Sequence, residues 1–148
     1  MNYVSQYNLN TKSLEIYLSG CLGNCKGCHN PEMKSFTIGD KLTESVIESI
    51  KDKASLRIVE NLMIMGGEPL DQKHYELIEF LNQIKKIKKP IWLFTRYDLE
   101  DIHKDVLKKL DYVKTGKYKK ELKTDNNIQY GIKLATSNQS IYKSGVEF

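Results

Sequence analysis

The chain has 148 residues, 40% of them hydrophobic and 28% charged, which predicts one globular domain over residues 1–148 and excludes a disordered chain. No apolar run approaches the ~20 residues of a membrane span, and the first residues lack the basic and apolar regions of a signal peptide, so we expect a cytoplasmic protein with no membrane partner. The net charge of +4 arises in residues 71–148, where sixteen basic side chains outnumber eleven acidic ones. Because no aromatic residues are interleaved with these lysines in the manner of single-strand-binding proteins, we expect no nucleic-acid partner.

The first half of the chain predicts a strand, a helix and a second strand. Residues 13–19 alternate apolar and polar side chains, which is typical of a strand with one buried face. Thr43 is a suitable N-cap for a helix whose apolar side chains recur at helical spacing through Ala54. Residues 58–65 form an apolar run that indicates a largely buried strand, and this strand ends abruptly at a pair of glycines.

The second half continues the alternation of helices and strands. A second helix is expected after Pro69, and it stops before Pro90 because the residue preceding a proline disfavours helical geometry. Residues 91–95 predict another strand. Asp98 is expected to cap a third helix, whose apolar stripe runs through Leu110.

A short strand at residues 112–113 completes a strand–loop–helix order that repeats three times, and this order predicts an α/β fold with a mainly parallel sheet. Residues 128–134 predict one further strand. In such folds ligands bind on the loops beyond the carboxyl ends of the strands. The loop 21–28 follows the first of the predicted strands and the loop 66–69 follows the next, so neighbouring parallel strands would bring the two loops together.

All three cysteines of the chain, Cys21, Cys25 and Cys28, lie in the first of these loops. Thiolates select soft metals and iron–sulfur clusters, and a [4Fe–4S] cluster usually takes four cysteines, so three would leave one iron open to a non-protein ligand. Two alternatives stay open at this point. One is a structural zinc site of the Cys3His type that uses His29, and the other is a thiol redox pair formed by the last two cysteines.

The second loop reads Met65-Gly66-Gly67-Glu68-Pro69. Two residues without a Cβ let backbone groups approach a ligand closely, and the proline fixes the exit from the loop. The Glu68 carboxylate could help to hold an ammonium group. An ordinary tight turn between a strand and a helix is the alternative interpretation.

The other two histidines, His74 and His103, fall on predicted helices among charged residues. We expect both to be surface residues. His29, taken alone, is expected to be a loop residue without a direct role.

The spacing CxxxCxxC after the first predicted strand, combined with Gly-Gly-Glu-Pro after the next, resembles the signature of the radical S-adenosylmethionine (SAM) enzymes. The resemblance implies a [4Fe–4S] cluster on the three cysteines, with the amino and carboxylate groups of SAM on the open iron. An electron from the reduced cluster then breaks the sulfonium C–S bond and leaves methionine and a 5′-deoxyadenosyl radical. It further implies that Gly66, Gly67 and Glu68 bind the SAM amino group and that backbone at Gly27 and His29 contacts the adenine.

Three later stretches, 91–97, 111–118 and 137–139, resemble motifs of the family of anaerobic ribonucleoside-triphosphate reductase-activating proteins. The resemblance implies a shortened, incomplete (β/α) barrel and places Thr95 in the cofactor site. The implied activity is abstraction of a glycine Cα hydrogen on the large glycyl radical subunit of the reductase. The implied electron donor is a protein such as flavodoxin or ferredoxin. An open barrel suits a macromolecular substrate, and the basic second half could be its docking face.

The sequence departs from the family pattern at three places. Arg96 stands where a glycine is usual, so this turn either changes conformation or gains a cation near SAM or the partner. Thr115 replaces a common aspartate. Residues 135–136 replace the usual Arg-Gly pair before Ser137-Asn138-Gln139. The alternative functions are an activase for a glycyl radical enzyme of the formate-lyase type and, in a different class, a non-catalytic zinc-binding interaction module.

Overall fold

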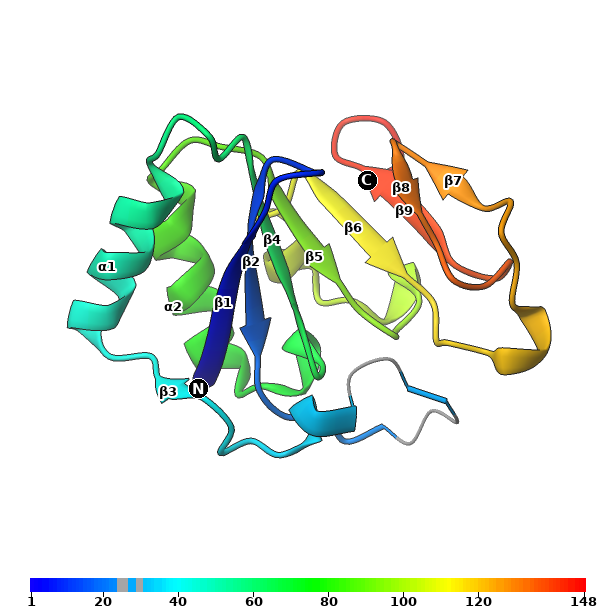
Figure 1. The fold of residues 1–148 in the computed structure, drawn as a ribbon, viewed down its shortest axis with the longest axis horizontal. Coiled ribbons are helices and arrows are strands. Elements are labelled where there is room, and N and C mark those ends of the chain that lie inside the picture. Colours follow the sequence, from blue (N-terminus) through cyan, green and yellow to red (C-terminus); the bar gives the residue numbers. More distant parts are fainter. Residues whose placement is uncertain (24–26, 29–30) are drawn as a thin grey trace.

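The computed structural model describes residues 1–23, 27–28 and 31–148, and Figure 1 shows how they are arranged around one sheet. Seven strands in these residues form the sheet: β1 Asn2–Asn8, β2 Ser13–Leu18, β3 Asp40–Lys41, β4 Asn61–Gly66, β5 Ile91–Phe94, β6 Tyr112–Thr115 and β9 Ser140–Lys143. Their spatial order is β3-β1-β2-β4-β5-β6-β9. β3 and β1 therefore lie at one side of the sheet, and the chain adds β4, β5, β6 and β9 in order toward the opposite edge.

The central part of this sheet is parallel. β2, β4, β5 and β6 pair in parallel, and Leu18 at the end of β2 lies level with Gly66 at the end of β4. The predicted α/β class with a mainly parallel central sheet is thus confirmed. The outer strands β1, β3 and β9 pair antiparallel with their neighbours and lie outside the predictions. The tight turn from β1 to β2 is held by Asn8, whose side-chain oxygen accepts the backbone N–H of Asn10 at 3.1 Å.

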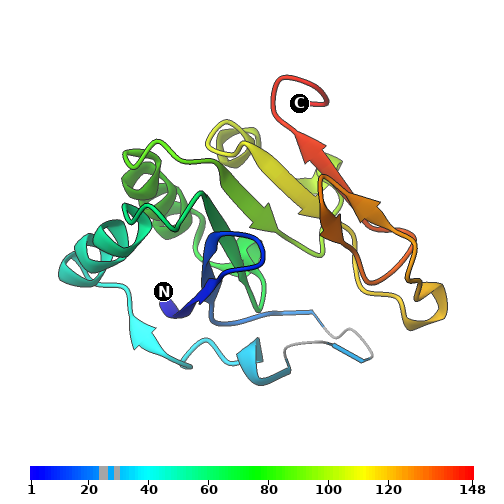
Figure 2. The same cartoon turned by 45° about the horizontal axis from the view of Figure 1, so that its top comes forward.

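Two helices, α1 (Glu44–Ala54) and α2 (His74–Lys85), lie side by side against the sheet (Figures 1 and 2). Thr43 caps α1 as predicted, because its hydroxyl accepts the Val46 N–H at 3.3 Å. The second helix starts later than expected, since a 3-10 turn, η2 (Pro69–Asp71), follows the glycine loop first. Ile50 of α1 and Phe80 of α2 belong to the main core with alternate residues of the parallel strands. No helix in the described residues has the length and apolar character needed to cross a membrane.

The third predicted helix is wrong as a continuous element. A 3-10 turn, η3 (Leu99–Asp101), and a one-turn helix, α3 (Lys104–Leu107), replace it, and the Asp98 side chain makes no capping hydrogen bond. Ile102 between them is extended, with φ −89° and ψ 129°, and it is buried in the main core. The apolar spacing therefore predicted burial correctly, while the backbone breaks so that Ile102 reaches the core.

The opposite face of the sheet is covered by a hairpin rather than by the single strand predicted for residues 128–134. β7 (Ile128–Gln129) and β8 (Ile132–Lys133) pair antiparallel around Tyr130 and Gly131, which have φ of 48° and 78°. A turn with two positive φ angles matches the twist of a two-residue hairpin. Leu134, directly after the hairpin, packs with Trp92 and Ile141 in a second apolar cluster.

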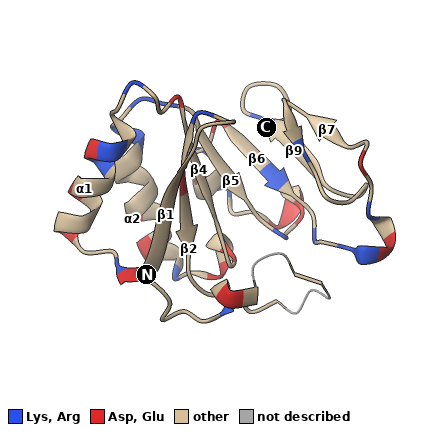
Figure 3. Ribbon diagram, in the orientation of Figure 1, with Lys and Arg blue, Asp and Glu red and all other residues tan. Residues whose placement is uncertain are grey.

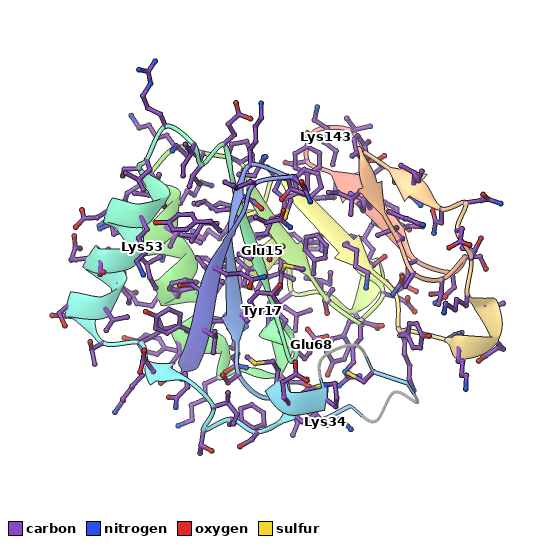
Figure 4. The ribbon with its side chains drawn as sticks, viewed as in Figure 1. Glu15, Tyr17, Lys34, Lys53, Glu68 and Lys143 are labelled. Carbon is purple, nitrogen blue, oxygen red and sulfur yellow. The ribbon has the colours of Figure 1, made fainter. Side chains whose placement is uncertain are left out.

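Two predictions about strands need correction. β2 is buried on both faces, because Glu15, expected to face solvent, is 5% exposed and accepts hydrogen bonds from Gln6 at 2.7 Å and from Tyr17 at 2.9 Å. Figure 4 shows Glu15 and Tyr17 on the same part of the sheet. Burial, together with the hydrogen bond to Glu15, raises the pKa of Tyr17 to about 12. β4 starts at Asn61 rather than at residue 58, since Ile58 is 55% exposed.

Candidate functional site

The cysteine loop and the glycine loop meet at the carboxyl ends of β2 and β4, as the sequence predicts. The Gly67 N–H donates to the Leu18 carbonyl at 3.1 Å, and the Glu68 N–H donates to the Gly20 carbonyl at 2.8 Å. The Gly20 N–H in turn donates at 2.7 Å to Met33 of η1 (Pro31–Lys34), so the far side of the cysteine loop joins the same network. Backbone hydrogen bonds therefore fix the two loops against each other.

A pocket of about 310 Å³ opens where these loops meet, which is within the size range of small-molecule sites. Cys21 and Cys28 line it from the first loop, Gly66 and Gly67 line it from the second, and Thr95 lines it from the end of β5. The hairpin β7–β8 closes the other side through Ile132 to Ala135. The predicted residues Cys25 and His29 lie outside the described residues.

The two glycines of the second loop have no room for a side chain. Gly66 has a φ of +135°, which L residues rarely adopt, and a Cβ there would lie 2.2 Å from the Leu18 carbonyl oxygen. A Cβ at Gly67 would lie 2.4 Å from the carbonyl oxygen of Gly20 and 2.6 Å from that of Met33. The glycines let one loop lie directly on the other, so they serve close backbone approach rather than an ordinary turn.

Glu68 is buried, at 1% exposure, and its carboxylate holds the ends of two strands together. It accepts hydrogen bonds from the Thr95 hydroxyl at 2.7 Å, from the Arg96 N–H at 2.7 Å and from the Leu70 N–H at 3.0 Å. Burial raises the pKa of Glu68, while these three donors act in the opposite direction. The side chain therefore links the glycine loop to the turn after β5 and belongs to the pocket lining; Figure 4 labels Glu68 near the ends of the central strands.

Gly27 and the segment after β6 approach each other across the pocket. Gly27 has a φ of +70°, and a Cβ there would lie 3.3 Å from the ring of Tyr118. Tyr118 itself lines the pocket. The stretch 111–118, which carried part of the family resemblance, thus contributes a wall of the site.

Asp71 is a functional neighbour of the cysteine loop that the sequence did not indicate. Its carboxylate accepts the Leu22 N–H at 2.7 Å, the Tyr97 hydroxyl at 2.5 Å and the Arg96 guanidinium at 3.1 Å. These donors come from the cysteine loop and from the turn after β5, so one buried side chain anchors both. No local pattern marks such a residue, because all its partners are distant in sequence.

Arg96 resolves the first departure from the family pattern. Arg96 is not among the described residues that have a positive φ. The turn therefore does not need a glycine at this position. The guanidinium is the cation of the Asp71 ion pair, and its Nε lies 3.9 Å from Glu68 Oε1. A Cβ at Gly23 would lie 2.5 Å from that Nε, so the cysteine loop rests directly on the Arg96 side chain.

Removing the Arg96 charge is expected to loosen the cysteine loop. Arg96→Met keeps most of the side-chain length but leaves the buried Asp71 carboxylate without its cation, and we expect a loss of about 2 kcal/mol in the free energy of unfolding. Arg96→Lys should recover part of this loss. Urea unfolding measures the stability, and hydrogen exchange at the Leu22 amide measures the loop. Unchanged exchange at Leu22 in Arg96→Met would show that the ion pair does not hold the loop.

The other departures lie in a network that fastens the end of the chain to the pocket. Gln139 is buried, accepts the N–H groups of Ala135 and Thr136 at 3.1 and 3.2 Å, and donates to the Gly116 carbonyl at 3.2 Å. The Thr115 side chain, also buried, donates to the Ser140 carbonyl at 3.4 Å. The 137–139 segment thus positions the residues that face Gly66 and Thr95 across the pocket.

The two remaining histidines lie outside the pocket lining. The His74 and His103 side chains are 47% and 74% exposed. The prediction that they are surface residues is confirmed.

The donor set in the pocket fits an iron–sulfur cluster. Cys21 and Cys28 are free thiols, partly buried, and both face the cavity with the glycine loop opposite them. Together with Cys25 they would supply three thiolates, and the adjoining space is large enough for a small-molecule ligand on a fourth iron.

The comparisons with known proteins agree with this site. The family model described as a 4Fe-4S single cluster domain matches residues 11–142, which places the chain among proteins that carry one such cluster. An anaerobic ribonucleoside-triphosphate reductase-activating protein of Enterobacteria phage T4 is 33% identical over 113 residues, which cover 74% of this chain and 72% of the relative. One of Haemophilus influenzae is 31% identical over 125 residues, covering 76% and 79%. The chain belongs to the anaerobic ribonucleoside-triphosphate reductase-activating protein family, and the resemblance seen in the sequence is confirmed.

A third relative of the same description, from Pasteurella multocida, is 27% identical over 162 residues, which cover 97% of this chain and 98% of the relative. Similarity at that level extends across the fold described above, including the hairpin and β9. No solved structure matches the chain at a significant level.

Proposed function

We propose that this chain is the activating enzyme of an anaerobic ribonucleoside-triphosphate reductase and installs a glycyl radical on the large subunit. The observation that carries the proposal is the packing of a three-cysteine loop on a Gly-Gly-Glu-Pro loop, with both loops lining one pocket at the carboxyl ends of parallel strands. When bound there, a reduced [4Fe–4S] cluster and SAM supply the radical chemistry that removes a hydrogen atom from a glycine Cα.

The chain's own residues would hold, orient and shield these groups. Cys21, Cys25 and Cys28 are the proposed cluster ligands. The Asp71–Arg96 ion pair holds the backbone between the first two of them, through the Leu22 N–H and the contact with Gly23. Because these contacts hold residues 22 and 23, binding a cluster would cost less ordering entropy at this end of the loop.

The SAM site is proposed on the glycine loop and the turn after β5. Gly66 and Gly67 line the pocket, and Glu68, held by Thr95 and by backbone N–H groups, would face the SAM ammonium group with its remaining lone-pair capacity. Gly27 and His29 are the proposed backbone contacts to adenine. The Ile132 to Ala135 segment would exclude water from the opposite side of the pocket.

The sheet would then be the shortened, incomplete radical SAM barrel, with residues 1–148 as one domain. The four parallel strands at its centre, flanked by antiparallel strands in an open sheet, support this proposal. A glycine on a loop of the reductase would have to reach the pocket from outside the sheet. We further propose a flavodoxin or ferredoxin as electron donor and action in the cytoplasm.

Basic residues around Tyr118 are the proposed docking face for the reductase. Lys117, Lys119 and Lys120 are exposed and flank a tyrosine that lines the pocket, and Figure 3 shows this basic region at the end of the molecule away from α1 and α2. Changing the three to glutamate is expected to weaken reductase binding by at least about tenfold at low salt and to reduce its salt dependence. SAM cleavage by the free chain should be unchanged.

A matched triple variant checks that prediction. Lys85, Lys86 and Lys88 are equally exposed but lie at the end of α2, so the same change to glutamate alters the net charge equally at a different place. Binding measured by surface plasmon resonance over a range of salt concentrations should fall only for the first triple. Equal losses for both triples would show a general charge effect and no docking face.

Anaerobic reconstitution with iron and sulfide tests the proposed function. We expect about four iron and four sulfide per chain, an EPR signal of the reduced cluster that changes on adding SAM, and formation of 5′-deoxyadenosine. Cys25→Ala should lose the cluster. A colourless chain that ignores SAM and holds one zinc that Cys25→Ala loses would instead support the interaction module. A glycyl radical formed only on a formate-lyase type enzyme would support the other activase.

A further inference from the structure

A second group of metal-ligating side chains lies away from the pocket. His74 at the start of α2, His103 just before α3 and Asp105 within α3 bring one ligand atom each to within 4.8 Å of one another. His74 Nε2 lies 2.6 Å from Asp105 Oδ2, and His103 Nδ1 lies 2.9 Å from Asp105 Oδ1. None of the three lines the cysteine pocket.

We propose that His74, His103 and Asp105 bind a divalent transition-metal ion of the zinc type. Two imidazoles and one carboxylate are borderline donors that suit Zn²⁺, Co²⁺ and Ni²⁺, whereas an iron–sulfur cluster needs thiolates. Three protein ligands leave a coordination position for water. The donor chemistry therefore separates this ion from the iron at the cysteines.

The observed contacts allow such an ion after small side-chain movements. Ligand atoms that share one tetrahedral zinc at about 2.0 Å lie about 3.3 Å apart. The two printed contacts, of 2.6 and 2.9 Å, are shorter than that, and all three ligand atoms lie within 4.8 Å of one another. The Oδ1 atom of Asp105 is buried and has no hydrogen-bond partner of good geometry in the described residues, although the His103 ring is close. The imidazoles are exposed enough to rotate, so an ion could satisfy this oxygen and replace the proton between His74 and Asp105.

The ion would add a coordination link between two segments that the His74–Asp105 hydrogen bond already joins. His74 is separated from Asp105 by 31 residues, and the two histidine rings lie 4.6 Å apart between their centroids. The neighbouring Lys73 and Lys104 carry positive charge and oppose cation binding, so we expect an ion held by coordination geometry rather than by an acidic surface. Binding to the folded chain alone would raise its thermal stability.

The test uses the full chain with its cluster already assembled, so that the cysteines are occupied. Zinc is added, excess is removed by desalting, and zinc and iron per chain are counted by elemental mass spectrometry. We expect one zinc with no loss of iron, together with a higher Tm. His74→Gln, His103→Gln and Asp105→Asn should each weaken zinc binding by at least about tenfold. Loss of a residue that only hydrogen-bonds to a ligand already costs roughly tenfold to a hundredfold in metal affinity.

Asp101→Asn is the matched control, because it removes an exposed carboxylate from η3, four residues from Asp105 and outside the group. It should bind zinc like the unchanged chain. The proposal is overturned if the chain binds no zinc, if zinc displaces iron, or if all four variants bind zinc equally. Since the readout counts metal and not radical formation, failure here would leave the proposed activase function untouched.

Discussion

Glu68→Ala is expected to lower the free energy of unfolding by about 3–5 kcal/mol, the cost typical of removing one partner from a buried charged network. Three donors that now share the carboxylate, Thr95 Oγ1, Arg96 N–H and Leu70 N–H, would be left in a buried place without their acceptor. The same change should abolish SAM binding, because the turn after β5 would separate from the glycine loop. Urea unfolding and calorimetric titration with SAM measure the two effects.

Two other variants are compared with Glu68→Ala to show that the loss of stability comes from the buried carboxylate. Glu68→Gln keeps one acceptor oxygen but places an NH2 group against a donor, so we expect a smaller loss of about 1–3 kcal/mol. Glu60→Ala removes an exposed carboxylate whose ion pair with Lys12 spans 3.8 Å, and we expect a change within about 0.5 kcal/mol. If Glu68→Ala were as stable as Glu60→Ala, the buried carboxylate would not hold the site together.

Gly67→Ala is expected to disrupt the contact between the two loops. The new Cβ would lie 2.4 and 2.6 Å from two backbone oxygens, which cannot rotate away, so the loops must separate. We expect a destabilisation of about 3 kcal/mol, at the upper end for overpacking. We also expect less cluster per chain after reconstitution, because Gly20 precedes the first cysteine directly. Thermal unfolding and the iron content report the two effects.

Gly131→Ala is the control for this substitution. Unlike Gly67, Gly131 has a positive φ, of +78°, but a Cβ there meets nothing within 4 Å. Its cost should therefore be only the roughly 1–2 kcal/mol of the left-handed conformation, with normal cluster content. Equal iron loss in both variants would mean that the close contact between the two loops does not govern cluster assembly.

Much of the fold could be predicted from the sequence, because its signals are local. Thr43 marks the start of α1 because its hydroxyl caps the helix, and the apolar runs of β4 and β5 indicate buried strands. The third helix was predicted from the same apolar spacing and is broken, because burial of Ile102 outweighs helical continuity. The hairpin within residues 128–134 depends on Tyr130 adopting a φ of 48°, which no apolar pattern encodes.

The residues of the site also fall into those that a local motif predicts and those that only the folded chain brings together. The cysteine and glycine loops could be identified because each is a short motif after a strand, and parallel pairing brings them together. Asp71 could not be found, since its role depends on donors from residues 22, 96 and 97 that meet only in the folded chain. Arg96 stood out as a departure from the family pattern, but its partner became visible only with the structure.

The measurement that tests the central claim most directly is EPR spectroscopy of the large reductase subunit after anaerobic incubation with the reconstituted chain, SAM and a reductant. We predict a glycyl radical signal on the reductase and one 5′-deoxyadenosine for each radical formed, with neither product when the chain carries Cys25→Ala. SAM cleavage that leaves the reductase without a radical would contradict the activase account.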